Sequence, residues 1–399
     1  MNFEYGLGIT PCCRESPENE VIGVARGMEK KTKAKDQRPS KGISTSASAA
    51  KEQSRQLHPI RQKVIVHSSP SIDAWRKLYQ LADEIKIVAP WKWMDELQIF
   101  ALQIDPEDEL VYCSIMGNGG EFSGIALYFG AVGLESYNAI QELLQDPFDL
   151  YLSQNCLMLT YDDSDLLKEE DKQLFKKLGS KYRGKGAYPL FRFLEPGFEP
   201  WFLSDDQAQF LIVALPKLID VAKTVKYDTE YLFNDEGLIR LFALDDRSEA
   251  PRWKDSWIPG YLPPEESQQP RLDEMRVNRI LKNCQKAPGV WELDYFYSPG
   301  LIQNKPKPFY MQVAMIVDKE EGTVVGYDLI MDDAHETVVA KLFDAMEKFK
   351  LVPRKVHVYK DDLYYLLEGM SKLFGFEISL VDELPSLSNM REVLADAIS

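Results

Sequence analysis

The sequence lacks several features that would assign it to a class of protein. Its five cysteines, at positions 12, 13, 113, 156 and 284, form neither a paired framework nor the repeated CxxC spacing of a zinc site. No apolar stretch approaches the roughly 20 residues that a membrane span requires, and the first ten residues have no basic region of a signal peptide. These absences predict reduced thiols, no membrane segment and a cytoplasmic location.

Recognisable nucleotide-binding and catalytic motifs are also missing. The glycine-rich segment 117–120 joins two expected strands rather than a strand and a helix, so it is typical of a turn and not of a phosphate-binding loop. We find no Ser, His and Asp arrangement with a nucleophile elbow. His335, on the apolar side of an expected helix, and His357, within an expected strand, are therefore predicted to be packed side chains.

The charge of the chain is strongly acidic but uneven. The formal net charge is −16, yet residues 1–66 hold 12 Lys plus Arg against 7 Asp plus Glu, which leaves −21 for the remainder. Such an acidic body repels a phosphate backbone at long range, so nucleic-acid binding would need a local basic groove or bound cations. The excess of acidic residues therefore argues against a nuclease and in favour of partners other than nucleic acid.

The composition predicts a tail, two domains and a connection. With 399 residues, 45% of them apolar, the chain can bury two cores. Residues 1–66 have no sustained hydrophobic period and are rich in Lys, Ser, Ala and Gln, which predicts a disordered tail. We expect an N-terminal α+β domain at 67–227, an irregular connecting segment at 228–269 with a strand near 238–242, and a C-terminal domain at 270–399.

Hydrophobic periodicity predicts the elements of the N-terminal domain. A helix begins near Ser71 and ends before Pro90. A second, strongly apolar helix follows Ser204 and Gln207, which are spaced as a capping box, and Pro216 is expected to kink or split it. Other helices are expected at 134–144 and 165–178, and strands of a mixed sheet at 99–104, 110–116, 124–129, 156–161 and 190–194.

The final third of the chain reads as three strands, then a helix, a strand, a helix, a strand and a helix. The strands are expected at 290–297, 309–317, 323–331, 355–359 and 376–381. This order resembles the ribonuclease-H-like fold. The expected class is therefore α/β, with the strand at 290–297 in the middle of a five-stranded mixed sheet.

The resemblance implies a set of catalytic carboxylates. Enzymes of this fold hold two magnesium or manganese ions with acidic groups on the first strand, the first helix, the end of the fourth strand and the last helix. The matching residues here are Asp294, Glu336, Asp361 and Asp396. Asp294, Glu336 and Asp361 would be the metal ligands of a nuclease, and Asp396 a fourth catalytic group.

Three of these four carboxylates have a structural explanation. Glu336 is spaced as the N3 partner of a capping Asp333, and Asp361 is placed to cap the next helix. Asp396 points away from the apolar face of the last helix. Only Asp294 has no local explanation, because a carboxylate among apolar neighbours is costly to bury without a partner.

One loop is a candidate anion site. Lys181, Arg183 and Lys185 alternate with other residues in a segment that also contains three glycines. Such a loop is either an exposed connection or a site for phosphate or carboxylate groups.

From about residue 75 onward the chain resembles an uncharacterised family of bacterial proteins that pair two domains of unknown function. The resemblance supports the two-domain division and the cytosolic location, and it implies no activity or ligand. It is carried by the segments Trp75–Tyr79, Ala89–Trp93, Ile115–Gly117, Tyr188–Arg192, Pro200–Leu203, Trp291–Tyr297 and Val381–Pro385.

These observations leave three hypotheses open. The first is a non-catalytic binding or regulatory protein with a protein partner, whose footprint would lie around Trp91, Trp93 and Trp201. The second is the metal-dependent nuclease described above, the only case that requires nucleic acid or a metal. The third is an enzyme that acts on a small anion near the loop of Lys181, Arg183 and Lys185.

Overall fold

The computed structural model describes residues 68–399, except for short segments at 121, 143–145, 246–251, 261–271, 304–306, 332 and 399. The expected tail at 1–66 lies outside the described residues. Residues Ser68–Ser399 form one compact unit. It contains mixed helices and sheets, which confirms the α/β class.

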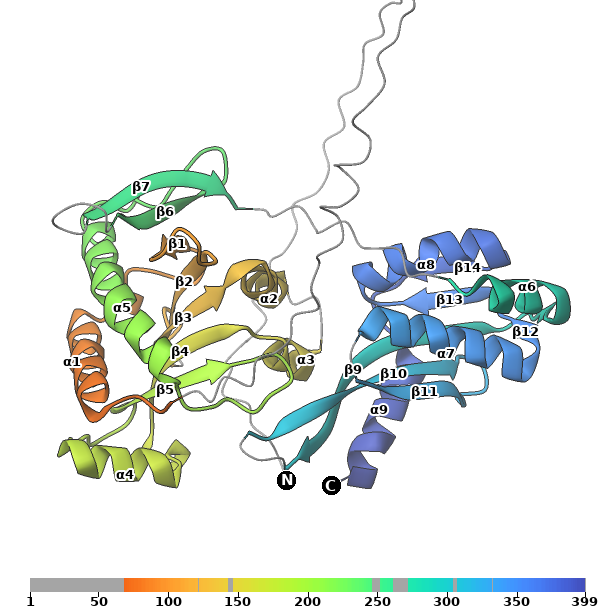
Figure 1. Cartoon of the computed structure of the whole chain (residues 1–399), viewed down its shortest axis with the longest axis horizontal. Helices are drawn as coiled ribbons and strands as arrows, with labels where there is room; N and C mark the ends of the chain where they lie inside the picture. The colour runs from red at the N-terminus through yellow and green to blue at the C-terminus, as the bar shows by residue number, and fades with distance from the viewer. Residues whose placement is uncertain are drawn as a thin grey trace, which may run out of the picture. The chain divides into compact units, whose positions relative to one another are not determined.

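The N-terminal part is built on a seven-stranded sheet (Figure 1). Its strand order is β5-β4-β3-β2-β1-β6-β7, and every neighbouring pair is antiparallel except β1 and β6. The strands are β1 (Phe100–Gln103), β2 (Val111–Met116), β3 (Gly124–Phe129), β4 (Cys156–Asp162), β5 (Tyr188–Leu194), β6 (Leu238–Asp245) and β7 (Arg252–Pro259).

Helices cover both faces of this sheet. Successive strand residues point to opposite faces, so Phe100 packs in the core under α1 (Ile72–Val88) and α5 (Asp205–Val225), whereas Ala101 packs in the core under α2 (Gly130–Glu142). Figure 1 shows α1 and α5 on one side of the strands and α2 with α3 (Pro147–Leu152) on the other. Helix α4 (Glu169–Leu178) lies between β4 and β5 in the chain, and short 3₁₀ turns occupy Pro90–Lys92 and Ser164–Leu166.

Two expectations for this part differ from the structure. The segment 228–269 is not a purely irregular connection, because β6 and β7 extend the first sheet; the polar side chains of β7 suit an exposed edge strand. Helix α5 continues through Pro216, so the proline does not split it, and a kink there stays a prediction. Its buried residues Leu211, Leu215 and Leu218 stay in the core on both sides of the proline, so packing outweighs the lost backbone hydrogen bond.

The C-terminal part follows the expected order of elements. Its five-stranded sheet has the order β11-β10-β9-β13-β14, with β9 in the middle, antiparallel to β10 and parallel to β13. A two-residue strand β12 (Leu351–Val352), which pairs with β8 (Gln285–Lys286), is the only addition to that order after β9 within the described segments. The main strands are β9 (Val290–Ile302), β10 (Phe309–Asp318), β11 (Val324–Ile330), β13 (Lys355–Val358) and β14 (Glu377–Leu380).

The two faces of β9 meet different helices. Trp291 and Leu293 pack in the core formed with α6 (Glu274–Asn283), α7 (Ala334–Phe349) and α8 (Asp361–Phe374). Phe296 packs on the opposite face with Leu384 and Leu387, at the start of α9 (Pro385–Ile398). The alternation along the strand therefore places Asp294 on the α9 face, although it is only 3% exposed.

The central position of β9 gives a direct test. We expect Leu293→Ala to lower the free energy of unfolding by about 3 kcal/mol, because it leaves a cavity in the core. The same substitution at Leu329 on the edge strand β11, where the side chain is 48% exposed, should cost less than about 1 kcal/mol. Urea unfolding of both variants measures the difference, and equal losses would contradict a central β9.

Candidate functional site

An almost fully buried ion pair joins the first half of β9 to the carboxyl end of β13. Lys360, just after β13, places its Nζ 3.2 Å from Oδ1 of Asp294 on β9. The side chains are only 7% and 5% exposed. Removing both charges from water is costly, so their mutual attraction must offset much of that cost.

Lys360 is held by more than the ion pair. Its ammonium group donates a hydrogen bond to the backbone carbonyl of Tyr295 and lies 3.8 Å from the centre of the Tyr295 ring. Oδ1 of Asp294 is buried and accepts no hydrogen bond of good geometry, so the Lys360 charge is its main compensation. Burial raises the pKa of Asp294, and the nearby charge of Lys360 acts in the opposite direction.

A hydrogen-bonded chain of three side chains adjoins this pair. The hydroxyl of Tyr295 donates to Oδ2 of Asp362 at 2.6 Å, and Nε2 of His335 lies 2.8 Å from the same oxygen. Asp362 and His335 lie in the first turns of α8 and α7. The three groups therefore link the middle strand to the beginnings of two helices.

These contacts shift the pKa values of the chain in consistent directions. Burial raises the pKa of Asp362, but the hydrogen bonds from His335 and Tyr295 outweigh it and leave the value below the usual range. The hydrogen bond to Asp362 raises the pKa of His335. Burial, followed by the charge of Asp362, raises the pKa of Tyr295. The geometry favours a carboxylate between an imidazole and a neutral phenol.

A second buried carboxylate meets the same strand. Oδ1 of Asp149 on α3 accepts a hydrogen bond from the backbone N–H of Tyr297 at 2.9 Å, and its Oδ2 lies 3.1 Å from Arg391 on α9. The Arg391 guanidinium also stacks 4.4 Å from the centre of the Phe296 ring. Burial raises the pKa of Asp149 to about 6, although Arg391 and Lys360 lower it.

The beginning of α9 is fixed by another acid of β9. Glu292 is fully buried, and its Oε2 accepts a hydrogen bond from the backbone N–H of Leu387 at 2.9 Å. This bond satisfies one of the free donors at the helix start. Lys319 lies 3.8 Å from the other oxygen of Glu292. Helix α9 is thus held at its start by Glu292 and further along by Asp149.

A cavity of about 230 Å³ opens beside these groups. Tyr295, Phe296 and Tyr297 of β9, together with Lys360, form one part of its wall. The rest of the wall comes from α2, α3, Pro196 and β10, and contributes Val132, Glu135, Ser136, Ala139, Asp149, Ser153 and Gln312.

The four carboxylates predicted for a nuclease are not brought together. Asp294 is buried against Lys360, whereas Glu336, Asp361 and Asp396 are exposed. Among the described residues, no group of three or more His, Cys, Asp or Glu side chains is arranged to hold a metal ion.

Two of these carboxylates, Glu336 and Asp361, lie at the beginnings of helices α7 and α8. Asp333 caps α7 by accepting a hydrogen bond from the Glu336 N–H at 2.8 Å, as predicted. Asp361 is the first residue of α8 rather than its N-cap, because Lys360 takes that position. The prediction for Asp361 was wrong by one residue, because Lys360, whose side chain pairs with Asp294, occupies the N-cap position.

The predicted anion loop is exposed and already anchored. Lys181, Arg183 and Lys185 are exposed. A backbone donor of the same loop, the Gly186 N–H, is bound at 2.6 Å by the carboxylate of Asp163, and Lys86 donates to the Gly186 carbonyl. These contacts explain the shape of the loop without a bound anion.

The tryptophans predicted to meet a partner are half-buried and have partners inside the fold. Trp91 packs against Tyr161, and Trp201 packs against Phe202. Trp93 donates a hydrogen bond from Nε1 to the Ala222 carbonyl at 3.0 Å. Binding of a protein partner around these three tryptophans stays a prediction.

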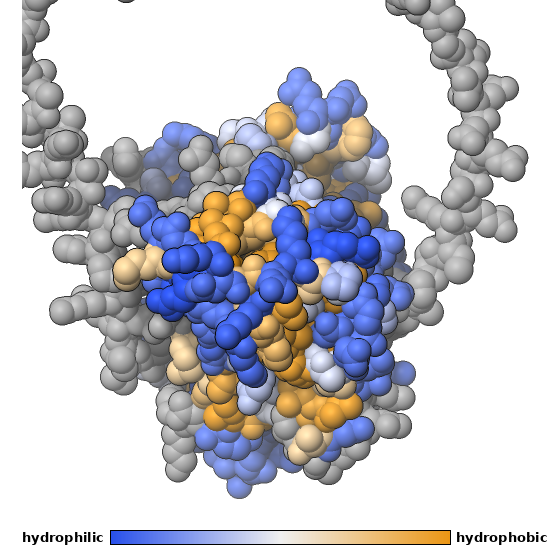
Figure 2. Space-filling model, turned by 90° about the vertical axis from the view of Figure 1, so that its right-hand side faces the viewer, coloured by the Kyte–Doolittle hydropathy of each residue, from blue (hydrophilic) through white to orange (hydrophobic). Residues whose placement is uncertain are grey.

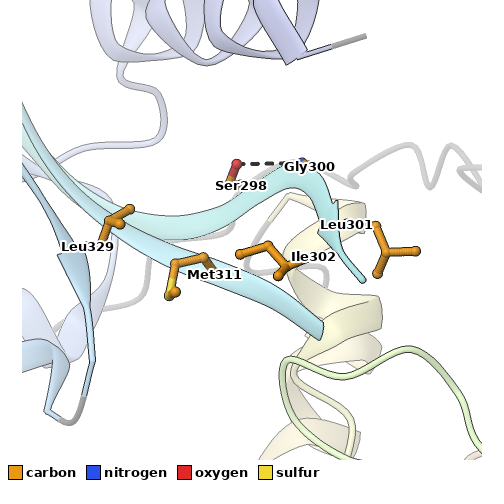
Figure 3. Close-up of a pocket in the computed structure, with 6 residues that line it drawn as sticks. All are labelled: Ser298, Gly300, Leu301, Ile302, Met311 and Leu329. Atoms are coloured by element: carbon orange, nitrogen blue, oxygen red, sulfur yellow. Dashed lines mark hydrogen bonds between the residues drawn. The ribbon is translucent and has the colours of Figure 1, made fainter. Parts of the chain in front are cut away.

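More strongly exposed apolar side chains lie on the edge strand β11 and at the residue directly after it. Tyr327, Leu329 and Met331 are 67%, 48% and 73% exposed, and their alternate spacing places them on one face. We name these three residues the β11 strip. Figure 3 shows Met311 of β10 between Leu329 and Ile302, where the three line an open hollow of about 300 Å³.

Several residues of the site were missed by the sequence analysis. Lys360 was overlooked because it precedes the candidate ligand Asp361, although a lysine directly after an apolar strand is itself a signal. Asp149 and Arg391 carry no such signal. They lie far apart in the chain, and only the fold brings them together.

Two stretches of the chain match known protein families. Residues 75–241 match the family model described as Domain of unknown function (DUF7309), and residues 276–395 match the one described as Domain of unknown function (DUF6930). No curated protein matches the chain significantly. In the part of the chain that the structure describes, no helix is both long and apolar enough to cross a membrane.

The buried pair predicts a strong asymmetry between single and double variants. Lys360→Met should lower the free energy of unfolding by about 3–5 kcal/mol, because it leaves the Asp294 carboxylate buried without a cation. The double variant Lys360→Met, Asp294→Asn should recover a large part of that loss. Lys341→Met, which removes a lysine that pairs with Asp328 and Asp344 near the surface, serves as the control and should cost less than about 1 kcal/mol. Denaturant unfolding checks the cycle; additive losses would contradict the pairing.

The raised pKa of Asp149 predicts a pH effect of defined sign. Its pKa is about 6 in the folded protein and near 3.8 in the unfolded chain, so protonation favours the folded state. The contribution is full below the unfolded value and is lost as the pH rises through about 6. We expect the free energy of unfolding of the wild type, relative to Asp149→Asn, to fall by about 3 kcal/mol between about pH 3 and pH 7. A difference that does not change with pH would contradict this assignment.

Proposed function

We propose that this chain, which pairs a DUF7309 domain with a DUF6930 domain, is a non-catalytic binding protein. The two families are described only as domains of unknown function, so the proposal rests on the geometry of this chain. We also propose that the DUF6930 domain has a ribonuclease-H-like fold, which the strand order β11-β10-β9-β13-β14 supports.

The observation that carries the proposal is the position of Lys360. A nuclease of this fold would hold cations against the first-strand carboxylate. Here the nearest positive charge to Asp294 is the ammonium of Lys360, at 3.2 Å, and it is buried with that carboxylate. A covalently attached cation cannot exchange, and it repels a metal ion that would share the same carboxylate.

The surface favours a protein as the partner. Residues 67–399 carry a formal charge of −21, which disfavours nucleic acid. Hydrophobic residues nevertheless form patches among hydrophilic ones on the face that Figure 2 presents. We assign the contact to the β11 strip, because β11 is an edge strand whose exposed apolar side chains adjoin unpaired backbone groups.

A cytoplasmic location is part of the proposal. Among the described cysteines, Cys113 and Cys156 are buried free thiols, and Cys284 is a partly exposed one. Free thiols are typical of a reducing compartment, which supports the location.

Site-specific photo-crosslinking tests the assigned surface. We expect a photoreactive residue in place of Tyr327 to crosslink the chain to a protein partner in cells that express it. The matched control carries the same residue in place of Tyr365 on α8, which is 60% exposed and lies outside the β11 strip. Leu329→Ser should reduce the yield at position 327, because it removes apolar area from the contact.

Two results would contradict the proposal. Equal crosslinking yields at positions 327 and 365 would contradict the assignment of the contact to the β11 strip. Cleavage of nucleic acid that requires magnesium or manganese and disappears in Asp294→Asn would replace the binding function with the nuclease hypothesis. A crosslinked product of twice the chain mass would identify the partner as a second copy.

A further inference from the structure

We propose that the cavity beside Tyr295 and Lys360 binds a small organic cation, such as an amine or a quaternary ammonium group. This binding site is separate from the protein contact assigned to the β11 strip. It rests on the wall of the cavity, which combines aromatic rings with one carboxylate that has no internal partner.

Most charged groups of the wall are neutralised from within. Lys360 is paired with Asp294, and Asp149 is paired with Arg391. Glu135 of α2 is the exception within the described ranges, because it forms no hydrogen bond or ion pair there. The cavity therefore has one negative charge without an internal partner, carried by an exposed residue of its wall.

An anion fits this wall poorly. The ammonium of Lys360 already faces the Tyr295 carbonyl, the Asp294 carboxylate and the Tyr295 ring, which occupy its donor directions. An incoming anion would meet Glu135 without gaining a free cationic donor. A cation instead gains the charge of Glu135 and contact with Tyr297, the aromatic residue of the wall whose ring is not already beside Lys360 or Arg391 among the described contacts.

The remaining polar groups are consistent with an ammonium ligand. The side-chain amide of Gln312 on β10 has no hydrogen-bond partner among the described residues, so its oxygen can accept a bond from an N–H group. The hydroxyls of Ser136 and Ser153 donate to the carbonyls of Gly133 and Leu150, which leaves their oxygens free to accept.

The volume limits the size of the ligand. At about 230 Å³ the cavity lies below the usual range of about 300–1,000 Å³ for drug-sized ligands. A nucleotide is therefore excluded, whereas a small amine with a short apolar portion can pack against Val132, Ala139 and Pro196.

Titration calorimetry and thermal unfolding of the full chain test the proposal. The probes are methylammonium, ethanolamine and choline as chloride salts, with sodium chloride at equal ionic strength as the reference. We expect at least one probe to bind and to raise the melting temperature, since a ligand that binds only the folded state stabilises it. Glu135→Gln should weaken that binding by at least about tenfold.

The control is Glu142→Gln, which makes the same chemical change on α2 away from the cavity wall, and it should bind like the wild type. Gln312→Leu provides a second variant that keeps the size of the side chain, and it should also bind the probe more weakly. Three results would overturn the proposal: no binding of any probe, equal affinity of wild type and Glu135→Gln, or binding of acetate or phosphate in place of the amines.

Discussion

A carboxylate in the middle of a buried strand requires a cation, and this requirement organises the C-terminal domain. Asp294 lies on β9, between strands on both sides and below α9. The cation comes from Lys360. Because β13 pairs with β9 in parallel, this lysine, just after β13, lies beside Asp294. Because α8 starts immediately after Lys360, the same contact determines where Asp362 meets Tyr295 and His335.

The identity of that cation also decides which chemistry the domain can support. A metal site needs several carboxylates that converge and share a positive charge. Here a lysine supplies the charge to one carboxylate, and Glu336, Asp361 and Asp396 remain exposed as ordinary helix residues. The strand order of this domain is the one expected for the ribonuclease-H-like fold that we propose, whereas its charges are arranged differently from those of a metal site. Fold and activity are separable for this physical reason.

The sequence predicted the fold better than the site. Apolar runs located β3 to the residue, β10 to within one residue and the beginning of β9, because strands that are buried on both faces produce such runs directly. The polar edge strand β7 and the charged helix α6 were missed, since neither has a strong apolar signal. The expected split at Pro216 was wrong, because the packing of α5 outweighs the local effect of the proline.

The site was harder because its members are brought together only by tertiary structure. Asp294 could be recognised as unusual from its apolar neighbours, but its partner could not be chosen among the many charged residues that follow it in the sequence. Asp149 and Arg391 meet only because α3 contacts the strand that α9 covers.

Together these ion pairs explain how a strongly acidic chain can bury carboxylates beside a cavity without giving the cavity a large negative charge. Each buried acid of the wall or behind it has its own cation: Lys360 for Asp294 and Arg391 for Asp149. The charge that a ligand experiences is then set by Glu135, the acid without such a cation in the described part of the wall. The selectivity of the cavity is thus determined by which carboxylate the fold leaves unpaired, rather than by the total charge of the chain.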